Sequence, residues 1–563
     1  MLTLNPGFVL IAAALLLLAA PRGLRVPTMA GAAVLAIWLM LDREFGAAAT
    51  MAQMGLPVVL LNLDPLNRIF GIAMLIASVL IALYSGARRN RFEDSAFMLL
   101  AGGAVSALFV GDLVSFVAAA ELAALAMASV VFASTSEGAA ASGVRMLIWF
   151  GLEGLLFLVG SALHLSAGAD SSVFTRLDVR QIGDAIIFAA LLIRVGAPLA
   201  HVWFKDAVRH ASPVGAPALT AFSTTLGVYA LARLFPAEPI LIPIGAAMTT
   251  IGLLYVVAED DLRAAGAAGM SAIVGLCVAL VGVGSPLALA AAAAHAFAAT
   301  FVFVALQMVL GAIVERNGSA RLSSLAGLSR VMPITSALLL FCGLATAAAP
   351  GTALFATLAV TLDALARWET NWLWLLSLLI APVFFASFAL RPAFAGAGET
   401  APRVRNEAPF AMLLGSAVAS FFCISIGIAP GWLYAFLPSE MTYQPLSLSH
   451  MALQFEILGG AGLAYTAARA AGLTPRDVAL RLWDVDAFYR GPLANLARWV
   501  GIIMLRIYGA TQNGFVGILG ATSQAASRLV RSFDRPYSPK SFGWTPVGLI
   551  GLALLVVLLF REM

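Results

Sequence analysis

The sequence predicts an all-α membrane protein that crosses the bilayer about 16 times, because apolar stretches long enough to span a ~30 Å hydrocarbon layer recur along it. Hydrophobic residues make up 61% of its 563 residues, charged residues only 11%, and the mean hydropathy is +0.96. Soluble domains contain about 25% charged residues, so a water-soluble core cannot account for this balance. We therefore expect the lipid bilayer to be the main environment of the chain.

The first apolar stretch begins near Pro6. It has neither a basic leading segment nor a small-residue cleavage site, so it is predicted to be a retained span and not a signal peptide. Arginines gather in the loops that follow the odd-numbered predicted spans, for example Arg88, Arg89 and Arg91 after the third. By the positive-inside rule these loops are cytoplasmic and the N-terminus lies outside. We expect a multi-pass protein of a bacterial-type inner membrane.

The predicted spans fall into five segments along the chain. These are residues 1–94 with three spans, 95–235 and 236–391 with five each, 392–440 with the fourteenth, and 441–563 with an amphipathic stretch and two further spans. Small residues and proline interrupt one span in each five-span block, at Arg194–Pro198 and at Ala347–Thr352. Matched breaks favour two inverted repeats around an ion path at the membrane midplane. Ordinary kinked helices are the alternative, since Gly and Pro are common in membrane spans. Residues 42–67 are expected to be irregular and external.

The cysteines and the glycine-rich strings carry no recognisable site. Cys277, Cys342 and Cys423 all fall in apolar stretches without the spacing of a disulfide, metal or iron–sulfur framework. The chain has no phosphate-binding loop, nucleophile elbow or nucleotide fingerprint. We expect no cofactor, no metal, no nucleic-acid partner and no redox or hydrolytic chemistry in this chain itself.

Few ionisable side chains lie inside the predicted spans, and each is costly to hold there. Glu121 lies in the fifth span, Glu153 in the sixth, Arg194 and His201 in the seventh, and His295 in the eleventh. A buried charge needs a counter-charge, so Arg194 is expected to pair with Glu121 or with Glu153. His295 could belong to an ion path, or it could be a neutral imidazole hydrogen-bonded between helices.

A series of short motifs between about residues 60 and 440 can be compared with known proteins. The strongest runs from Arg194 to Arg233, RVGAPLAHVWFKDAVRHASPVGAPALTAFSTTLGVYALAR. The others are DPLNRIF, ELAALAMAS, EDDLRAAGAAGMSAIVG, HAFAATFVF, RVMPITSALLLFCGLATAAAPGTALF and EAPFAMLLG. In order and spacing they resemble the antiporter-like membrane subunits of proton-translocating NADH:quinone oxidoreductase (complex I), membrane-bound hydrogenases and Mrp-type Na⁺/H⁺ antiporters. GIAPGWLYAFLP and DVDAFYR further resemble D-type Mrp subunits.

The resemblance implies a row of lysines, histidines and acids along which protons move, with a glutamate–lysine pair on helices five and seven. It therefore implies the following candidates for a proton or ion path: Glu121, Arg194, His201, His295, Glu153, Asp206 and Asp261. It also implies partners, namely other membrane subunits of the same complex, and it implies protons as the ion, with Na⁺ as a further candidate.

The chain departs from the family pattern at the lysines. Arg194 replaces the seventh-helix lysine, Thr225 stands at the eighth-helix position and Ala299 at the eleventh. The twelfth-helix lysine or glutamate falls within residues 356–358, which are Ala, Thr and Leu. A buried lysine can shed its proton, whereas arginine keeps its proton under ordinary conditions. EDDLRAAGAAGMSAIVG resembles the family's QNDLKRLLAYSSISQLG, but the hydroxyl-bearing string YSSISQ has thinned to AGMSAI.

The leading interpretation is a membrane subunit of a multisubunit proton- or cation-translocating complex with a degenerate proton relay. An active proton channel that uses Glu121, Arg194, His201 and His295 is the second. A membrane partner of a solute-uptake complex, for instance for inorganic carbon, is the third, and a stand-alone secondary transporter is the fourth. Whether the complex is an oxidoreductase or an antiporter is left open.

Overall fold

The computed structural model describes residues 4–53, 56–87, 90–167, 173–366, 371–392, 406–439, 444–472 and Trp499. The chain divides into two compact units, Met1–Trp483 and Asp484–Met563, and every element named below belongs to the first. The predicted amphipathic stretch over residues 474–535, apart from Trp499, and the predicted last span over residues 547–560 lie outside the described residues. The five predicted segments stay predictions.

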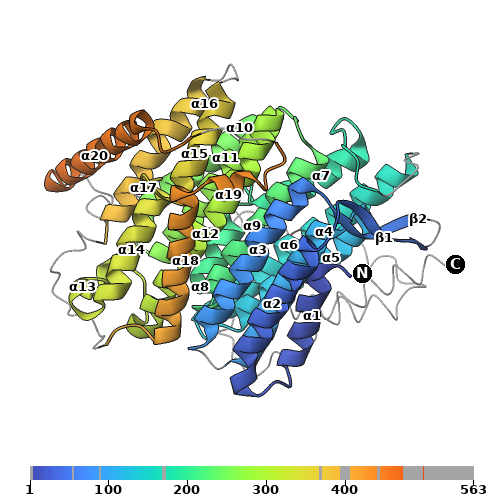
Figure 1. Cartoon of the computed structure of the whole chain (residues 1–563), viewed down its shortest axis with the longest axis horizontal. Helices are drawn as coiled ribbons and strands as arrows, with labels where there is room; N and C mark the ends of the chain where they lie inside the picture. The colour runs from blue at the N-terminus through green and yellow to red at the C-terminus, as the bar shows by residue number, and fades with distance from the viewer. Residues whose placement is uncertain are drawn as a thin grey trace. The chain divides into compact units, whose positions relative to one another are not determined.

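Helices dominate the first unit (Figure 1). They are α1 (Pro6–Leu17), α2 (Arg25–Leu41), α3 (Pro65–Ser85), α4 (Arg91–Phe109), α5 (Leu113–Phe132), α6 (Ala139–Ser166), α7 (Ile182–Val195), α8 (Val202–His210), α9 (Gly215–Leu234), α10 (Leu241–Ala258), α11 (Leu262–Val283), α12 (Pro286–Asn317), α13 (Leu328–Val331), α14 (Pro333–Thr346), α15 (Ala353–Ala366), α16 (Asn371–Leu375), α17 (Ala381–Leu390), α18 (Phe410–Ile428), α19 (Gly431–Tyr434) and α20 (Leu448–Ala470). One turn of π-helix, Leu376–Ile380, joins α16 to α17.

Within the described residues, ten helices are long and apolar enough to cross a membrane. The shorter helices α1, α14 and α15 are also apolar. The predicted fold class, an all-α multi-pass membrane protein, is confirmed. The helix expected over residues 450–470 is present as α20, although it is not among the ten. The number of sixteen spans stays a prediction.

The segment expected to be irregular is a β-hairpin, so that prediction was wrong. Strands β1 (Gly46–Gln53) and β2 (Leu56–Leu63) pair antiparallel. The run PVVLLNL contains the β-branched and apolar residues that favour strands, and pairing satisfies the backbone groups of both segments. The Asp112 carboxylate, at the start of α5, accepts a hydrogen bond from the Val59 N–H at 2.7 Å. The hairpin is thus anchored to the helices beside it.

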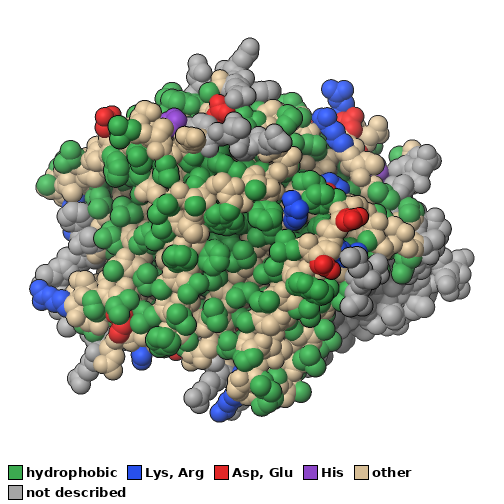
Figure 2. Space-filling view, viewed as in Figure 1, with side chains coloured by type: hydrophobic (Ala, Val, Ile, Leu, Met, Phe, Trp, Pro, Cys, Tyr) green, Lys and Arg blue, Asp and Glu red, His purple; other side chains and the backbone are tan. Residues whose placement is uncertain are grey.

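Three helices, α9, α11 and α12, form the centre of the first unit and are buried along nearly their whole length (Figure 1). The 32-residue helix α12 packs against α3, α9, α11, α14, α15 and α18. A helix that is apolar all round is stable only where neighbours or lipid cover every face. The large exposed hydrophobic side chains lie instead on the outer helices, for example Leu155 of α6 and Phe421 of α18. Figure 2 shows one face on which hydrophobic side chains predominate and charged ones are sparse, as a lipid-facing surface requires.

Both predicted helix breaks are present. Helix α7 ends at Val195, Gly196 has a φ of 72°, and the chain resumes as α8. Helix α14 ends at Thr346, Gly351 has a φ of 83°, and the chain resumes as α15. Backbone groups released by a break inside a membrane need new partners. The Trp203 indole N–H donates to the Ile193 carbonyl at 3.0 Å. That the two halves are inverted repeats stays a prediction.

Helices α10 and α11 touch through their backbones. A Cβ placed on Gly245 would lie 2.3 Å from the Gly275 carbonyl oxygen, and one on Gly275 would lie 2.6 Å from the Gly245 carbonyl oxygen. Glycine at membrane helix crossings allows this close approach and the dispersion contacts that follow from it. The crossing lies in the N-terminal part of α10, and residues nearer the C-terminal end of this helix border the site described below.

We predict that Gly245→Val destabilises the protein by roughly 1–3 kcal/mol, because the added side chain forces the two helices apart. The matched control is Gly151→Val, since a Cβ on Gly151 of α6 meets nothing within 4 Å. The same small gain in helix propensity applies to both variants, because valine is a better helix former than glycine. The thermal unfolding midpoint of the full-length chain in detergent is the measurement. Equal midpoints for the two variants would show that the crossing does not contribute.

Candidate functional site

A fully buried ion pair joins α6 and α7. Arg194 Nε donates to Glu153 Oε1 at 2.9 Å, and Arg194 Nη2 donates to Glu153 Oε2 at 2.6 Å. The side chains are 0% and 1% exposed, respectively. Two parallel hydrogen bonds make this the strong, directional form of an arginine–carboxylate contact. Of the two partners expected for Arg194, the structure selects Glu153.

The neighbours of Arg194 shape a pocket that fits a guanidinium. Arg194 lies in the last turn of α7, next to the helix break. Its Cζ lies 5.4 Å from the ring centroid of Phe150, which is one turn before Glu153 on α6. On the side of α9, Gly227 leaves room, since a Cβ there would lie 3.2 Å from Arg194 Cγ. An aromatic face stabilises a desolvated cation, so Phe150 adds a favourable contact to the Arg194–Glu153 pair.

Glu121 lies beside this pair without replacing Glu153 in it. The half-buried Glu121 of α5 is so close to Gly154 of α6 that a Cβ on Gly154 would lie 2.2 Å from Glu121 Oε1. Both Glu153 and Arg194 act on the Glu121 carboxyl electrostatically. The cluster therefore contains two carboxyl groups and one guanidinium. Because Glu153 already neutralises Arg194, Glu121 is the member that can bind or release a proton with the least disturbance.

His201 lies at the break and lines a small cavity. It precedes the first residue of α8, and its ring centroid is 5.7 Å from that of Tyr255 on α10. Gly196, Lys205 and Ser271 are among the other residues around the cavity. The cavity thus lies between the broken helix and the pair α10–α11. His201 is therefore one of the polar groups that line this cavity.

His295 is joined to the second broken helix. His295 Nδ1 is 3.0 Å from Thr357 Oγ1, and that hydroxyl donates to the Ala353 carbonyl at 3.2 Å. Because the hydroxyl hydrogen is used on its own helix, the network assigns the proton to His295 Nδ1. His295 Nε2 has no hydrogen-bond partner among the described residues. Thr357 lies within the three positions at which the resemblance implies a lysine or glutamate. In place of an ionisable side chain there, the chain has a threonine that is hydrogen-bonded to His295.

Asp206 ties α8 to the N-terminal part of α6. Its carboxylate accepts hydrogen bonds from Arg145 Nε at 3.0 Å, Arg145 Nη2 at 2.9 Å and Ser142 Oγ at 2.7 Å. Burial by itself would raise the pKa of the Asp206 carboxyl, but hydrogen bonds from His210, Ser142 and Arg145 and the Arg145 charge hold that pKa well below its usual range. Asp206 is therefore a permanently ionised anchor in this geometry.

Asp261 caps the N-terminus of α11. Its Oδ1 accepts from the backbone N–H groups of Arg263 at 3.0 Å and Ala264 at 3.4 Å, and its Oδ2 is 3.6 Å from Arg209 Nε. A carboxylate at this position satisfies free N–H groups and interacts favourably with the helix dipole. The geometry thus gives Asp261, like Asp206, an anchoring place away from the Arg194–Glu153 pair.

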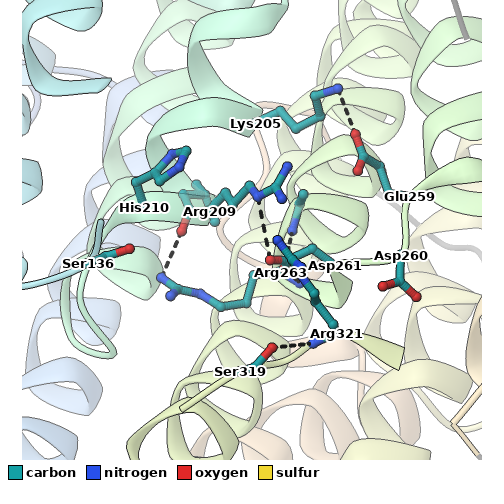
Figure 3. Close-up of polar contacts among 12 residues, drawn as sticks. Ser136, Lys205, Arg209, His210, Glu259, Asp260, Asp261, Arg263, Ser319 and Arg321 are labelled. Carbon is teal, nitrogen blue, oxygen red and sulfur yellow. Dashed lines mark hydrogen bonds and ion pairs between the residues drawn. The ribbon is translucent and has the colours of Figure 1, made fainter. Parts of the chain in front are cut away.

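The sequence analysis missed the contact between Lys205 and Glu259. Lys205 Nζ is 2.8 Å from Glu259 Oε1 and 3.7 Å from the ring centroid of Tyr255. Figure 3 shows Lys205 and Arg209 of α8 facing Glu259 and Asp261. Only Lys205 and Lys540 are lysines in the whole chain, and this rarity was a usable signal.

No metal site is formed within the described part of the chain. No group of three or more His, Cys, Asp or Glu side chains converges there as metal ligands would. Cys277, Cys342 and Cys423 are buried and free.

The fold and the buried charges define a multi-pass membrane protein with an ion pair and two histidines between its helices. Residues 110–384 match the family of the transmembrane NADH:quinone oxidoreductase/Mrp antiporter region, so this part of the chain belongs to the antiporter-like membrane subunits. The predicted family is confirmed. That the chain is nearest to D-type Mrp subunits stays a prediction.

Known relatives resemble the chain over part of their length. This chain is 26% identical over 227 residues to NAD(P)H-quinone oxidoreductase chain 4 1 of Synechococcus elongatus. The aligned region covers 37% of this chain and 43% of the relative. It is also 27% identical over 318 residues to a probable K⁺/H⁺ antiporter subunit of Rhizobium meliloti. That aligned region covers 52% of this chain and 31% of the relative. The chain thus spans less than half of the length of these relatives.

A solved structure shares the fold over most of the chain. A chain of respiratory complex I from Thermus thermophilus with bound NADH superposes with a TM-score of 0.69 at 21% identity, over 82% of this chain and 100% of that chain.

We predict that Glu153→Gln lowers the free energy of unfolding by about 3–5 kcal/mol, because it leaves the Arg194 charge buried without its partner. Glu121→Gln is the matched control, and it should cost much less because Glu121 does not form the ion pair. The thermal unfolding midpoint of each full-length variant in detergent measures the difference. A larger loss for Glu121→Gln than for Glu153→Gln would contradict the pairing described here.

Proposed function

We propose that this chain is a membrane subunit of a multisubunit proton- or cation-translocating complex. In this proposal the Arg194–Glu153 pair is a fixed ion pair and does not carry protons. The observation that carries this proposal is the fully buried, doubly hydrogen-bonded contact between the two side chains. The family's lysine at this position can lose its proton when it is desolvated, whereas arginine keeps its proton. The proton relay is therefore degenerate at its seventh-helix step.

The names of similar proteins support the proposed partners and ion. Among the relatives are a quinone oxidoreductase chain and a K⁺/H⁺ antiporter subunit. By that analogy, other membrane subunits are the partners of this chain, and protons are the first candidate for the ion, with Na⁺ as the second. The distribution of arginines supports a bacterial-type inner membrane with the N-terminus outside. Nothing in the structure favours the solute-uptake or stand-alone transporter interpretations over this one.

We predict that Arg194→Lys increases proton flux severalfold, because lysine restores a group that can titrate next to Glu153 and Glu121. The measurement is the decay of an imposed pH gradient in liposomes that contain the full-length chain. Arg316→Lys is the matched control, since Arg316 lies at the end of α12 and donates to the Glu407 carbonyl outside the site. Unchanged flux in a correctly folded Arg194→Lys variant would contradict a relay disabled by arginine.

A second candidate is a chain that still conducts protons through its histidines. It is favoured by His295, which is 2% exposed, bonds Thr357 through Nδ1 and leaves Nε2 without a partner among the described residues. A neutral imidazole can accept a proton on one nitrogen and release one from the other, as a proton shuttle requires. His201, which lines the cavity at the break that follows α7, is the other histidine of this candidate.

For this second candidate we predict that His295→Gln lowers the proton flux of the wild type by roughly tenfold or more, because glutamine cannot titrate. Thr300→Val on the same helix is the control, since the Thr300 hydroxyl bonds only the Ala296 carbonyl one turn earlier in the described structure. The same liposome measurement applies. Equal flux in the wild type and the His295→Gln variant would exclude His295 from the path.

A further inference from the structure

The cavity at the break of α7 has one charged border. It is surrounded by residues of the break, of α10 and of α11, most of them small or apolar: Gly196, Pro198, Met248, Ile251, Gly252 and Ala268. His201, Lys205, Tyr255 and Ser271 are the polar residues around it. His201 and Lys205 are four residues apart, so they point to the same side of this short helical segment. The cavity thus connects an imidazole to an ammonium group.

The Lys205–Glu259 pair lies between this cavity and the surface. The two side chains are 11% and 19% exposed, whereas Arg194 and Glu153 are 0% and 1% exposed. Lys205 Nζ is held by the Glu259 carboxylate at 2.8 Å on one side and by the Tyr255 ring at 3.7 Å on the other. This pair is more exposed than the Arg194–Glu153 pair, so opening it costs less free energy than opening the core pair.

Opening of this pair does not release α8, because other contacts hold the helix. Arg209 reaches Asp261 at 3.6 Å, and Asp206 is bonded to Arg145. Arg263 Nη2 donates to the carbonyl oxygens of residues 208 and 211, each at 2.7 Å. The pair is therefore dispensable for the position of α8, in contrast to the Arg194–Glu153 pair at the core.

Further charged groups surround the pair on all sides. Arg209 and His201 lie on or beside α8, Asp260 and Asp261 follow Glu259 directly, and Arg263 is the second residue of α11. Arg391, at the end of α17, donates to the Val256 carbonyl at 2.9 Å and also bonds the Glu259 carbonyl. Arg391 thus fixes the backbone that carries Glu259, while the Glu259 carboxylate stays with Lys205.

We propose that Lys205 and Glu259 exchange protons between the aqueous surface and the cavity in front of His201, and that their ion pair closes the cavity at rest. The exchange role rests on the second proposed function, conduction through the histidines. It places a lysine–glutamate pair at the break that follows α7, apart from the fully buried Arg194–Glu153 pair.

The proton transfers balance in three steps. The Glu259 carboxylate takes a proton from a hydronium ion at the surface, which releases a water molecule and breaks the ion pair. The Lys205 ammonium then gives a proton to the neutral His201 imidazole across the cavity. Finally the Glu259 carboxylic acid reprotonates the Lys205 amine, and the ion pair forms again. The net result is one proton moved from the surface to His201.

The first test compares variants in the liposome flux measurement with the full-length chain. Lys205→Arg keeps a positive charge opposite Glu259, but arginine does not release its proton as lysine can. This variant should reduce the flux by roughly tenfold or more. Glu259→Gln should reduce it similarly. Arg209→Gln, which removes the neighbouring contact with Asp261, should stay within about twofold of the wild type. Wild-type flux in Lys205→Arg would overturn the exchange role, because a purely structural ion pair would survive this substitution.

The second test reports closure of the cavity and needs no transport. A cysteine in the variant His201→Cys is treated with a small cationic methanethiosulfonate reagent, and the native cysteines are all buried. Glu259→Gln in this background should speed labelling by roughly tenfold. Arg209→Gln should leave the rate unchanged. Equal rates in all three backgrounds would overturn closure by the pair.

The two tests separate the failure of this inference from that of the proposed function. If the wild type carries no proton flux, conduction through the histidines is wrong and the exchange role falls with it. The labelling rates still decide whether the Lys205–Glu259 pair closes the cavity. If the wild type conducts and Lys205→Arg does not change the flux, only the exchange role is wrong.

Discussion

The need to neutralise one arginine inside the membrane determines how the helices around it are arranged. A guanidinium without a partner is costly in a hydrocarbon environment, and removal of one member of a buried pair costs several kcal/mol. The structure meets this need with Glu153, the face of Phe150 and the space left by Gly227. Helices α6, α7 and α9 must therefore keep their mutual positions. A charge held so firmly is suited to structure and to electrostatic influence on Glu121, and it is poorly suited to carrying protons.

The groups proposed to exchange protons, His201 and Lys205, lie beyond the helix break that follows Arg194. The chain turns at Gly196 and resumes as α8, so that His201 and Lys205 face a cavity and not lipid. Several ionic contacts hold α8 from its other sides, which leaves the partly exposed Lys205–Glu259 contact able to open. The same fold thus contains one immobile ion pair in the core and one accessible pair near the surface. Their difference in exposure is the physical reason for assigning them different roles.

Most of the fold could be predicted from the sequence, whereas only part of the site could. Hydropathy identified the membrane class, and the small-residue strings at Arg194–Pro198 and Ala347–Thr352 identified both helix breaks. The β-hairpin was not predicted, because residues 42–67 contain few charges and only short apolar runs. Neither feature marks these residues as strands. Glu121 and Glu153 were equally good partners for Arg194 in sequence, since nothing local shows which helix face points at α7.

By itself, the sequence predicted a multi-pass membrane protein that resembles antiporter-like subunits, with an arginine where that resemblance implies a lysine. Those conclusions depend on composition, spacing and motif order, which are local properties of the chain. Only the tertiary structure decided which charges meet. The partners of Arg194, Lys205 and His295 lie 41, 54 and 62 positions away. Packing brings such distant residues together, and no local pattern specifies the orientation of one buried helix toward another.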